Sequence, residues 1–165
     1  MKMNKKNILT LYSFKEDAIE NRIDFLKNTL FFEDYHLDIY YIKDLFGDKA
    51  DELIIEYQSV KRSGKDPTYL INNKLIEKKL EEILQETQPE IIIIHSGILF
   101  HLFFESILNF LIRIKQKYSK IEIGIENISL YSEIFPIDEK TLNTINDDTE
   151  EIRLIMKNLY FRGDI

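Results

Sequence analysis

The sequence predicts an α/β protein of Rossmann-like, flavodoxin-like architecture, with a doubly wound and mainly parallel sheet of four to five strands and helices on both faces. One observation is an unbroken apolar run, Ile91 to Ile94, bounded by Pro89 and by the polar and small residues that follow position 94. Such a run is typical of a strand buried on both faces of a parallel sheet. A second observation is that the apolar period switches repeatedly between strand and helix along the chain. The length of 165 residues suits a single domain spanning residues 1–165.

Four segments have the length and apolar content of strands. They are residues 7–13, 37–42, 89–94 and 121–125. Because crossovers between parallel strands are right-handed, the simplest arrangement is the order 2-1-3-4. The first and third strands then lie side by side at the centre of the sheet, and the helices that follow them leave on opposite faces.

Helical periodicity fills most of the intervals between these strands. The expected helices are residues 15–32, 50–60, 66–86, 99–114 and a final helix from about 147 to 162. Asp66 followed by Pro67 has the pattern of a helix N-cap with proline at the first helical position. Acidic residues at the start of the final helix and basic residues at its end match the helix dipole. Residues 126–136 are expected to form an irregular loop.

Composition excludes several classes of protein. The net charge of −7, from 29 acidic and 22 basic residues, argues against a nucleic-acid partner. No segment approaches the roughly 18 apolar residues that a membrane span requires, so we expect no membrane association. The chain has no cysteine, which excludes disulfides, thiolate metal ligands and cysteine nucleophiles. Together with an amino terminus that lacks a signal-peptide pattern, this composition leads us to expect a cytoplasmic protein.

The candidate ligand site follows from the ends of the predicted strands. In open α/β sheets, ligands bind at the carboxyl ends of the strands, where the strand order reverses. The residues that the sequence delivers there are Ser13, His95, Ser96, Gly97, Glu126 and Asn127. The sequence therefore predicts where a ligand binds, but leaves its identity and any cofactor unknown.

Each of these residues also has a structural interpretation. A histidine at the end of an apolar strand is more often a hydrogen-bonded structural residue than a ligand or catalyst. His101 and Glu105 are four residues apart on one predicted helix, where they fit an ordinary side-chain pair. Their spacing with His95 matches no established metal motif, so we predict no metal site. Ser13 and His95 could act as nucleophile and base only if the fold supplied an oxyanion hole as well.

Three families on this scaffold share features with the chain. Ser13, Gly64 and the segment ending in Gly97 resemble the conserved blocks of GDSL/SGNH hydrolases, which implies ester hydrolysis. Leu99 and Phe100 stand where that family has Asn and Asp, and no histidine follows His101. Conventional hydrolysis would lack these groups.

Two further resemblances are partial. Residues 90–159 resemble the cobalamin-binding domains of radical enzymes, but lack the Asp-x-His-x-x-Gly motif that ligates the cobalt. Residues 89–97 are similar to a strand in the amino-terminal lobe of two-lobed glycosyltransferases, and the lobe that would hold the sugar nucleotide has no counterpart in this sequence. Three partial matches to one scaffold favour the scaffold over any one family.

The sequence leaves three classes of function open. The leading hypothesis is a stand-alone Rossmann-like binding or protein-interaction domain, in which any small ligand would lie at the Ser13/His95–Gly97 crevice. The alternatives are a small hydrolase or transferase that uses Ser13 and His95, and an oligomeric regulator with a flat, exposed apolar face. The hydrophobic residues of the loop 126–136 and the pair Phe31 and Phe32 could form a partner or dimer surface, although their pattern favours burial against their own domain. Both a monomer and a homo-oligomer are compatible with the sequence.

Overall fold

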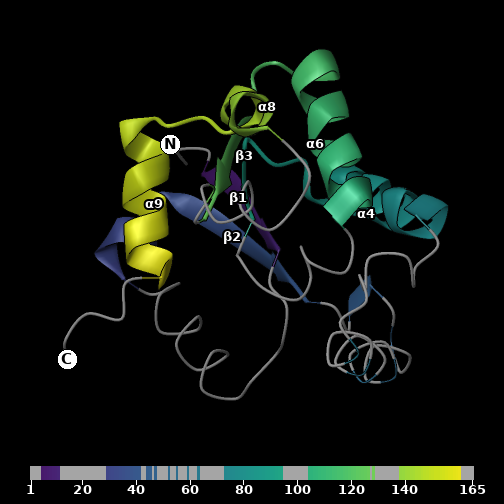
Figure 1. Cartoon of the computed structure of the whole chain (residues 1–165). Helices are drawn as coiled ribbons and strands as arrows, with labels where there is room; N and C mark the ends of the chain where they lie inside the picture. Colours follow the sequence, from purple (N-terminus) through teal and green to yellow (C-terminus); the bar gives the residue numbers. More distant parts are fainter. Residues whose placement is uncertain are drawn as a thin grey trace.

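The computed structural model describes residues 5–11, 29–41, 44–45, 73–94, 104–126 and 138–160, together with the single residues 47, 52, 55, 59, 63 and 128. Its sheet consists of four parallel strands in the order β2-β1-β3-β4. The strands are β1 (Lys6–Leu11), β2 (Tyr35–Tyr40), β3 (Ile91–Ile94) and β4 (Glu122–Ile125). This arrangement confirms the predicted α/β Rossmann-like fold and its strand order (Figure 1).

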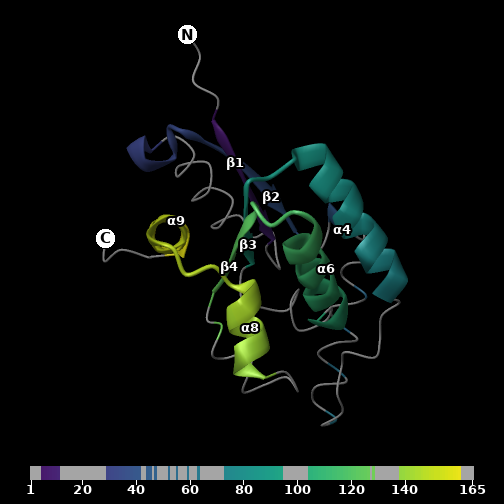
Figure 2. The same cartoon turned by 90° about the horizontal axis from the view of Figure 1, so that it is seen from above.

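Helices lie on both faces of the sheet. One face is covered by α4 (Asn73–Thr87) and α6 (Phe104–Lys117), with α8 (Glu139–Ile145) beside α6. The other face carries α9 (Glu150–Tyr160) and the short 3-10 helix η1 (Leu30–Phe32). Figure 2 shows the sheet between α9 on one side and α4 and α6 on the other. None of the described helices is both long enough and apolar enough to cross a membrane.

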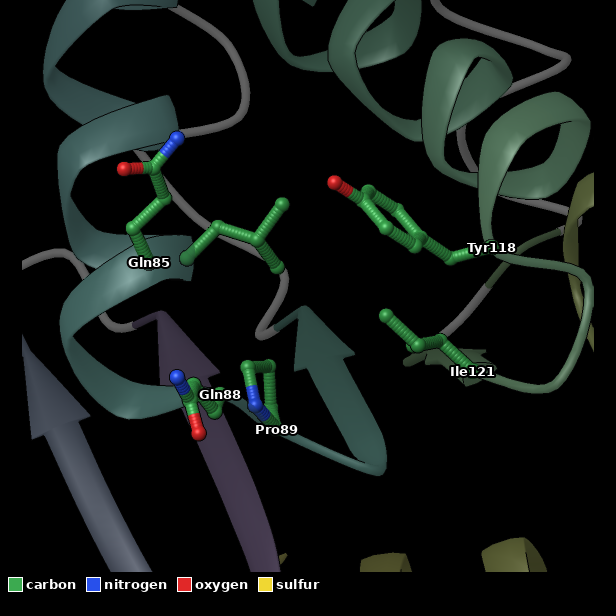
Figure 3. A pocket seen from close by; sticks show the side chains of 6 residues that line it. Gln85, Gln88, Pro89, Tyr118 and Ile121 are labelled. Atoms are coloured by element: carbon green, nitrogen blue, oxygen red, sulfur yellow. The ribbon is translucent and has the colours of Figure 1, made fainter.

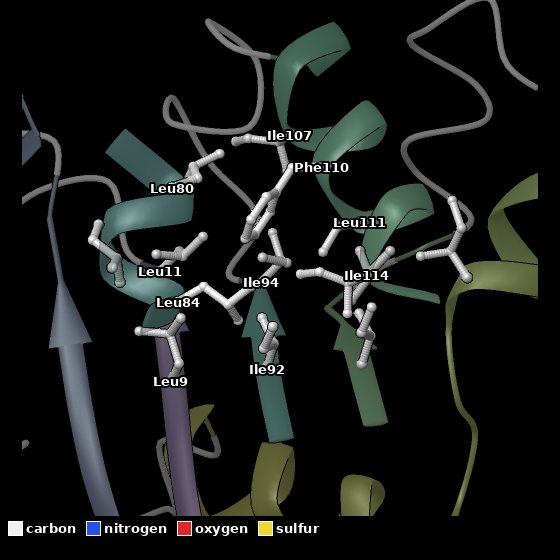
Figure 4. Packing of buried hydrophobic residues seen from close by; sticks show 14 of the residues in the cluster. Leu9, Leu11, Leu80, Leu84, Ile92, Ile94, Ile107, Phe110, Leu111 and Ile114 are labelled. Carbon is white, nitrogen blue, oxygen red and sulfur yellow. The ribbon is translucent and has the colours of Figure 1, made fainter. Parts of the chain in front are cut away.

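The central strand β3 contributes to two separate cores because successive side chains of a strand point to opposite faces. Ile92 and Ile94 pack beneath α4 and α6, in the larger cluster drawn in Figure 4. Ile91 and Ile93 pack on the other side, beneath α9. All four side chains are at most 1% exposed, so the apolar run is buried on both faces as predicted.

Several expected elements differ in extent. The predicted helix does not include residues 29–32: Thr29 has an extended backbone (φ −81°, ψ 157°), and Leu30–Phe32 form the 3-10 helix η1. Residues 12–28, most of the predicted helix 50–60 and residues 64–72 at the start of helix 66–86 lie outside the described residues. Within the described residues, α4 ends at Thr87 and α6 at Lys117, one and three residues later than predicted, and α9 begins at Glu150, about three residues later than predicted.

The helix α8 is absent from the sequence prediction. Its amino terminus is capped by Asp138, whose carboxylate accepts a hydrogen bond of 2.7 Å from the backbone N–H of Thr141. Leu142 and Ile145 lie on its buried side. The helix has seven residues and two buried apolar side chains, so it is too short to show a helical periodicity in the sequence.

The outer edge of β4 is closed by the segment that links α8 to α9. The backbone N–H groups of Ile123 and Ile125 donate to side-chain oxygens of Asp147 and Asn146, each at 2.8 Å. Asp147 returns a backbone hydrogen bond to the carbonyl of Ile123. Its carboxylate is also paired with Lys115 of α6. These two side chains occupy the hydrogen-bonding positions that a further strand would use.

Close packing of α9 on β4 depends on Gly124. A methyl group at this position would lie 2.6 Å from Cγ2 of Ile152 and 2.9 Å from Cδ1 of Ile93. Both distances are well inside van der Waals contact, so the absence of a side chain allows the helix to approach the strand.

We expect Gly124→Ala to lower the free energy of unfolding by about 1–3 kcal/mol, because the added methyl group forces α9 away from the sheet. Urea denaturation measures this change. In an Ile152→Ala background the same substitution should cost less, since the nearest clashing atom is gone. Equal costs in the two backgrounds would show that the contact with Ile152 is not the cause.

Candidate functional site

The candidate site begins where β1 and β3 end. The two strands are paired in parallel, and their last residues, Leu11 and Ile94, are direct partners. On the outer sides of this pair, Tyr40 ends β2 opposite Leu11, and Ile125 ends β4 opposite Ile94. All four strands therefore end at the same level of the sheet.

Most of the residues predicted for the site lie outside the described residues. These residues are Ser13, His95, Ser96, Gly97 and Asn127. His101, Gly64 and Asp66, which the sequence interpretation also singled out, lie outside the described residues as well. The structure thus fixes the strand ends that lead into the site rather than the side chains within it.

Glu126 is the predicted site residue that the structure describes. Its backbone N–H donates a hydrogen bond of 3.0 Å to the carbonyl of Ile94. That carbonyl belongs to the peptide that joins Ile94 to His95, so Glu126 lies directly beside the start of the predicted site. The residue is half-buried.

Acidic groups also lie beyond the end of β2. The Asp44 carboxylate accepts a hydrogen bond of 2.8 Å from the backbone N–H of Tyr41. The pKa of the Tyr40 phenol is raised, first by burial and then by the negative charges of Glu86, Asp38 and Asp44. With Glu126 at the end of β4, the described part of this edge carries carboxylates at both sides of the β1–β3 pair.

Thr10 is a candidate that the sequence interpretation did not single out. It lies in the central strand β1, one residue before the strand ends, and it is 0% exposed. In the described structure its hydroxyl oxygen has no hydrogen-bond partner. A buried hydroxyl without a partner destabilises a fold. We therefore expect the free energy of unfolding to change when this hydroxyl is removed. The signal in the sequence was one hydroxyl within the apolar run from Ile8 to Leu11.

A groove formed by described residues lies elsewhere, near the amino ends of β3 and β4. It has a volume of about 490 Å³, between the carboxyl ends of α4 and α6 (Figure 3). Its apolar wall consists of Leu84, Pro89 and Ile121, and its polar rim of Gln85, Gln88 and Tyr118. A second hollow of about 460 Å³ continues it between α4 and α6, past Arg113 and Lys117.

This groove is open to solvent, and its lining residues include few groups that could bind or activate a ligand. Its lining contains no charged residue, and Tyr118 at its rim is 40% exposed. In the adjoining hollow, Arg113 is 3.5 Å from Glu81, so its charge is already paired. Across the described ranges, no three His, Asp or Glu side chains are grouped closely enough to hold a metal ion. We therefore keep the carboxyl edge as the candidate site.

A polar cluster ties the amino ends of β1 and β2 to α9. The Glu151 carboxylate accepts hydrogen bonds from Nζ of Lys6 at 2.9 Å and from the hydroxyl of Tyr35 at 2.7 Å. Burial opposes the negative charge on Glu151, but these two hydrogen bonds outweigh burial and lower its pKa. Burial and the nearby carboxylate raise the pKa of Tyr35. Each group has a partner and a structural role, so the cluster is part of the scaffold.

The strand order, the helices on both faces and the strand ends at one edge define a Rossmann-like α/β protein. Comparison with known proteins finds no family model that matches this chain, and no curated protein or solved structure with significant similarity. Function is therefore argued from the chain's own residues.

We expect Thr10→Val to raise the free energy of unfolding by about 1 kcal/mol, because it replaces an unpaired buried hydroxyl by a methyl group of similar size. Thr10→Ser, which keeps the hydroxyl and removes the methyl group, should lower the free energy of unfolding by about 1 kcal/mol. Chemical denaturation of both variants measures the difference. A less stable Thr10→Val would mean that the hydroxyl has a partner in solution.

Proposed function

We propose that the protein is a binding domain that holds a small polar ligand in the crevice at the carboxyl ends of β1 and β3. The residues that would contact the ligand are Ser13, His95, Ser96, Gly97, Glu126 and Asn127. A hydroxyl, an imidazole, an amide and a carboxylate among them offer both hydrogen-bond donors and acceptors.

The observation that carries this proposal is the pairing of Leu11 with Ile94 at the ends of neighbouring strands. His95 is bonded directly to Ile94, and Ser13 is two residues from Leu11, so covalent geometry keeps both close to this edge. The strand order reverses here: β1 connects outward to β2, and β3 connects to β4 on the opposite side. Such a reversal opens a crevice between the diverging connections.

Charge favours a ligand that is neutral or positively charged. Glu126 and Asp44 follow the ends of β4 and β2, and Glu16 and Asp17 follow the end of β1 in the sequence. A phosphate ligand in this fold is normally held by a glycine-rich turn and a helix amino terminus, and carboxylates there would repel it. We therefore expect amines, polyols or neutral amides to bind better than phosphorylated compounds.

The test is a thermal-shift screen of amines, polyols, neutral amides and phosphorylated compounds on the wild-type protein. A ligand at 100 times its dissociation constant stabilises the folded protein by about 2.7 kcal/mol. We expect a hit from the amine or neutral classes, and we expect His95→Ala to lose most of the shift while its melting temperature without ligand stays close to that of the wild type.

Tyr118→Ala is the matched control, because it removes an aromatic side chain that lines both hollows between α4 and α6. This variant should keep the full ligand shift. Loss of the shift in Tyr118→Ala with retention in His95→Ala would move the site to the groove between α4 and α6. A screen in which only phosphorylated compounds bind would contradict the predicted ligand chemistry.

A further inference from the structure

The two edges of the sheet differ in the hydrogen bonding of their outward backbone groups. At the β4 edge, Asn146 and Asp147 form hydrogen bonds with three outward backbone groups, the N–H of Ile123, the N–H of Ile125 and the C=O of Ile123. At the β2 edge, no strand of the described structure pairs with the outer side of β2. An edge strand with unpaired N–H and C=O groups is a template for pairing with another chain.

The register shows which groups of β2 point outward. The backbone N–H of Lys6 donates to the carbonyl of Asp34 at 3.1 Å, and Lys6 is the partner of Tyr35. In a parallel ladder this pattern turns the even-numbered backbone groups of β2 toward β1. Because successive residues alternate, the N–H and C=O groups of Tyr35, Leu37 and Ile39 point away from β1. No hydrogen bond to these outward groups is found within the described part of the chain.

The outward backbone groups of β2 can pair with the same groups of a second copy of the chain. In an antiparallel pair centred on Leu37, each Leu37 would exchange both backbone hydrogen bonds with the Leu37 of a second copy. Tyr35 would do the same with Ile39 of that copy. The centre of the strand is thus a two-fold axis that uses every outward group from residue 35 to residue 39.

The side chains of His36 and Asp38 favour the same register. Centring the pair on Leu37 places His36 directly opposite Asp38 of the second copy, twice across the axis. Within one chain these two side chains already lie together, with His36 Nε2 3.2 Å from Asp38 Oδ1, and the His36 side chain is 61% exposed. An imidazole can donate a hydrogen bond to a carboxylate that faces it across two strands, and such a pair stabilises the pairing. Sliding one strand by two residues would instead place Asp38 against Asp38, which is destabilising.

Apolar surface lies at the start of the same strand. Leu30 in η1 is 87% exposed, the largest exposure among the described large apolar side chains that are exposed. Phe31 is only half-buried, and its ring stacks on that of Tyr35, with centroids 5.8 Å apart. A second copy that pairs along β2 would bring further chain against this apolar surface.

We propose that β2 is a homodimer interface, in which two copies of the chain join their sheets by antiparallel pairing of residues 35–39 centred on Leu37. The dimer would be a continuous sheet with β4 at both outer ends, where Asn146 and Asp147 prevent further addition. The interface is separate from the ligand crevice, so its test does not depend on the proposed ligand.

Cysteine pairing tests the register directly, because the chain has no cysteine of its own. Directly opposed residues of an antiparallel pair that lack backbone hydrogen bonds have Cα atoms about 4.5 Å apart, within the range of a disulfide. We expect a mixture of the His36→Cys and Asp38→Cys proteins to form an intermolecular disulfide under mild oxidation. The diagonal pairs in each protein alone are about 7–8 Å apart and should react much less.

The outcomes are read by non-reducing electrophoresis and mass spectrometry of the linked peptides. Lys157→Cys, at an exposed position on α9, gives the background of random collision. A 36–38 crosslink well above this background in the mixture supports the proposal. Crosslinking that is as strong in either single protein, or no stronger than Lys157→Cys, overturns it, as does a monomer at high concentration by sedimentation velocity.

A charge series tests the same contact without oxidation. His36→Glu should weaken the dimer by about 2- to 30-fold, because each substituted residue then faces Asp38 of the second copy. The double variant His36→Glu/Asp38→Lys should restore dimerisation, because the new carboxylate at position 36 then faces the new ammonium group at position 38 of the second copy. Glu82→Lys, an exposed change on α4, should leave the dissociation constant as in the wild type.

Melting curves of dilute samples separate association from stability. All variants in the series should melt near the wild-type temperature when diluted to monomers. A dimer that is insensitive to His36→Glu, or that the double variant does not restore, contradicts the proposed register.

Discussion

Burial of β3 on both faces is the constraint on which the rest of the structure depends. Its four isoleucines supply the middle of two cores at once, two under α4 and α6 and two under α9. Full burial of such a side chain contributes about 1.5–3 kcal/mol relative to exposure. A shift of one residue in the pairing of this strand would exchange the isoleucines between the two cores, so its register is tied to both layers of helices.

The position of β3 also determines what the edges of the sheet can do. With β1 and β3 at the centre, the connections that follow them begin side by side, and this is where a ligand crevice can form. The outer strands have different roles: β4 is closed by Asn146 and Asp147, while β2 keeps outward backbone groups. Within the described residues, one edge of the sheet is therefore closed by side chains, and the outer side of the other edge has no paired strand.

Much of the fold could be predicted because it follows from patterns of length and period. The apolar run of β3, the alternation of strands and helices and the right-handed crossovers were sufficient for the strand order. The helix α8 was missed because its stability comes from the Asp138 cap and two contacts rather than from a long apolar stripe. The extended backbone of Thr29 ends the predicted helix before Leu30 although the apolar period continues, so the periodic pattern did not indicate this break.

The candidate site could be predicted only as a place. Strand ends are readable in a sequence, and Glu126 does lie beside the peptide that follows Ile94. Side-chain geometry at Ser13 and His95 depends on connections outside the described residues, and no periodicity determines it. Thr10 was missed because a single threonine in an apolar strand is common, and only its lack of a partner makes it unusual.

Native-state hydrogen exchange tests the central role of β3 most directly. The amides of Ile92 and Ile94 should exchange only through global unfolding, with an opening free energy equal to that measured by denaturation, and the amides of β1 that pair with β3 should behave in the same way. Exchange of Ile92 and Ile94 through local openings that are easier than global unfolding, while α4 or α9 stays protected, would contradict this account.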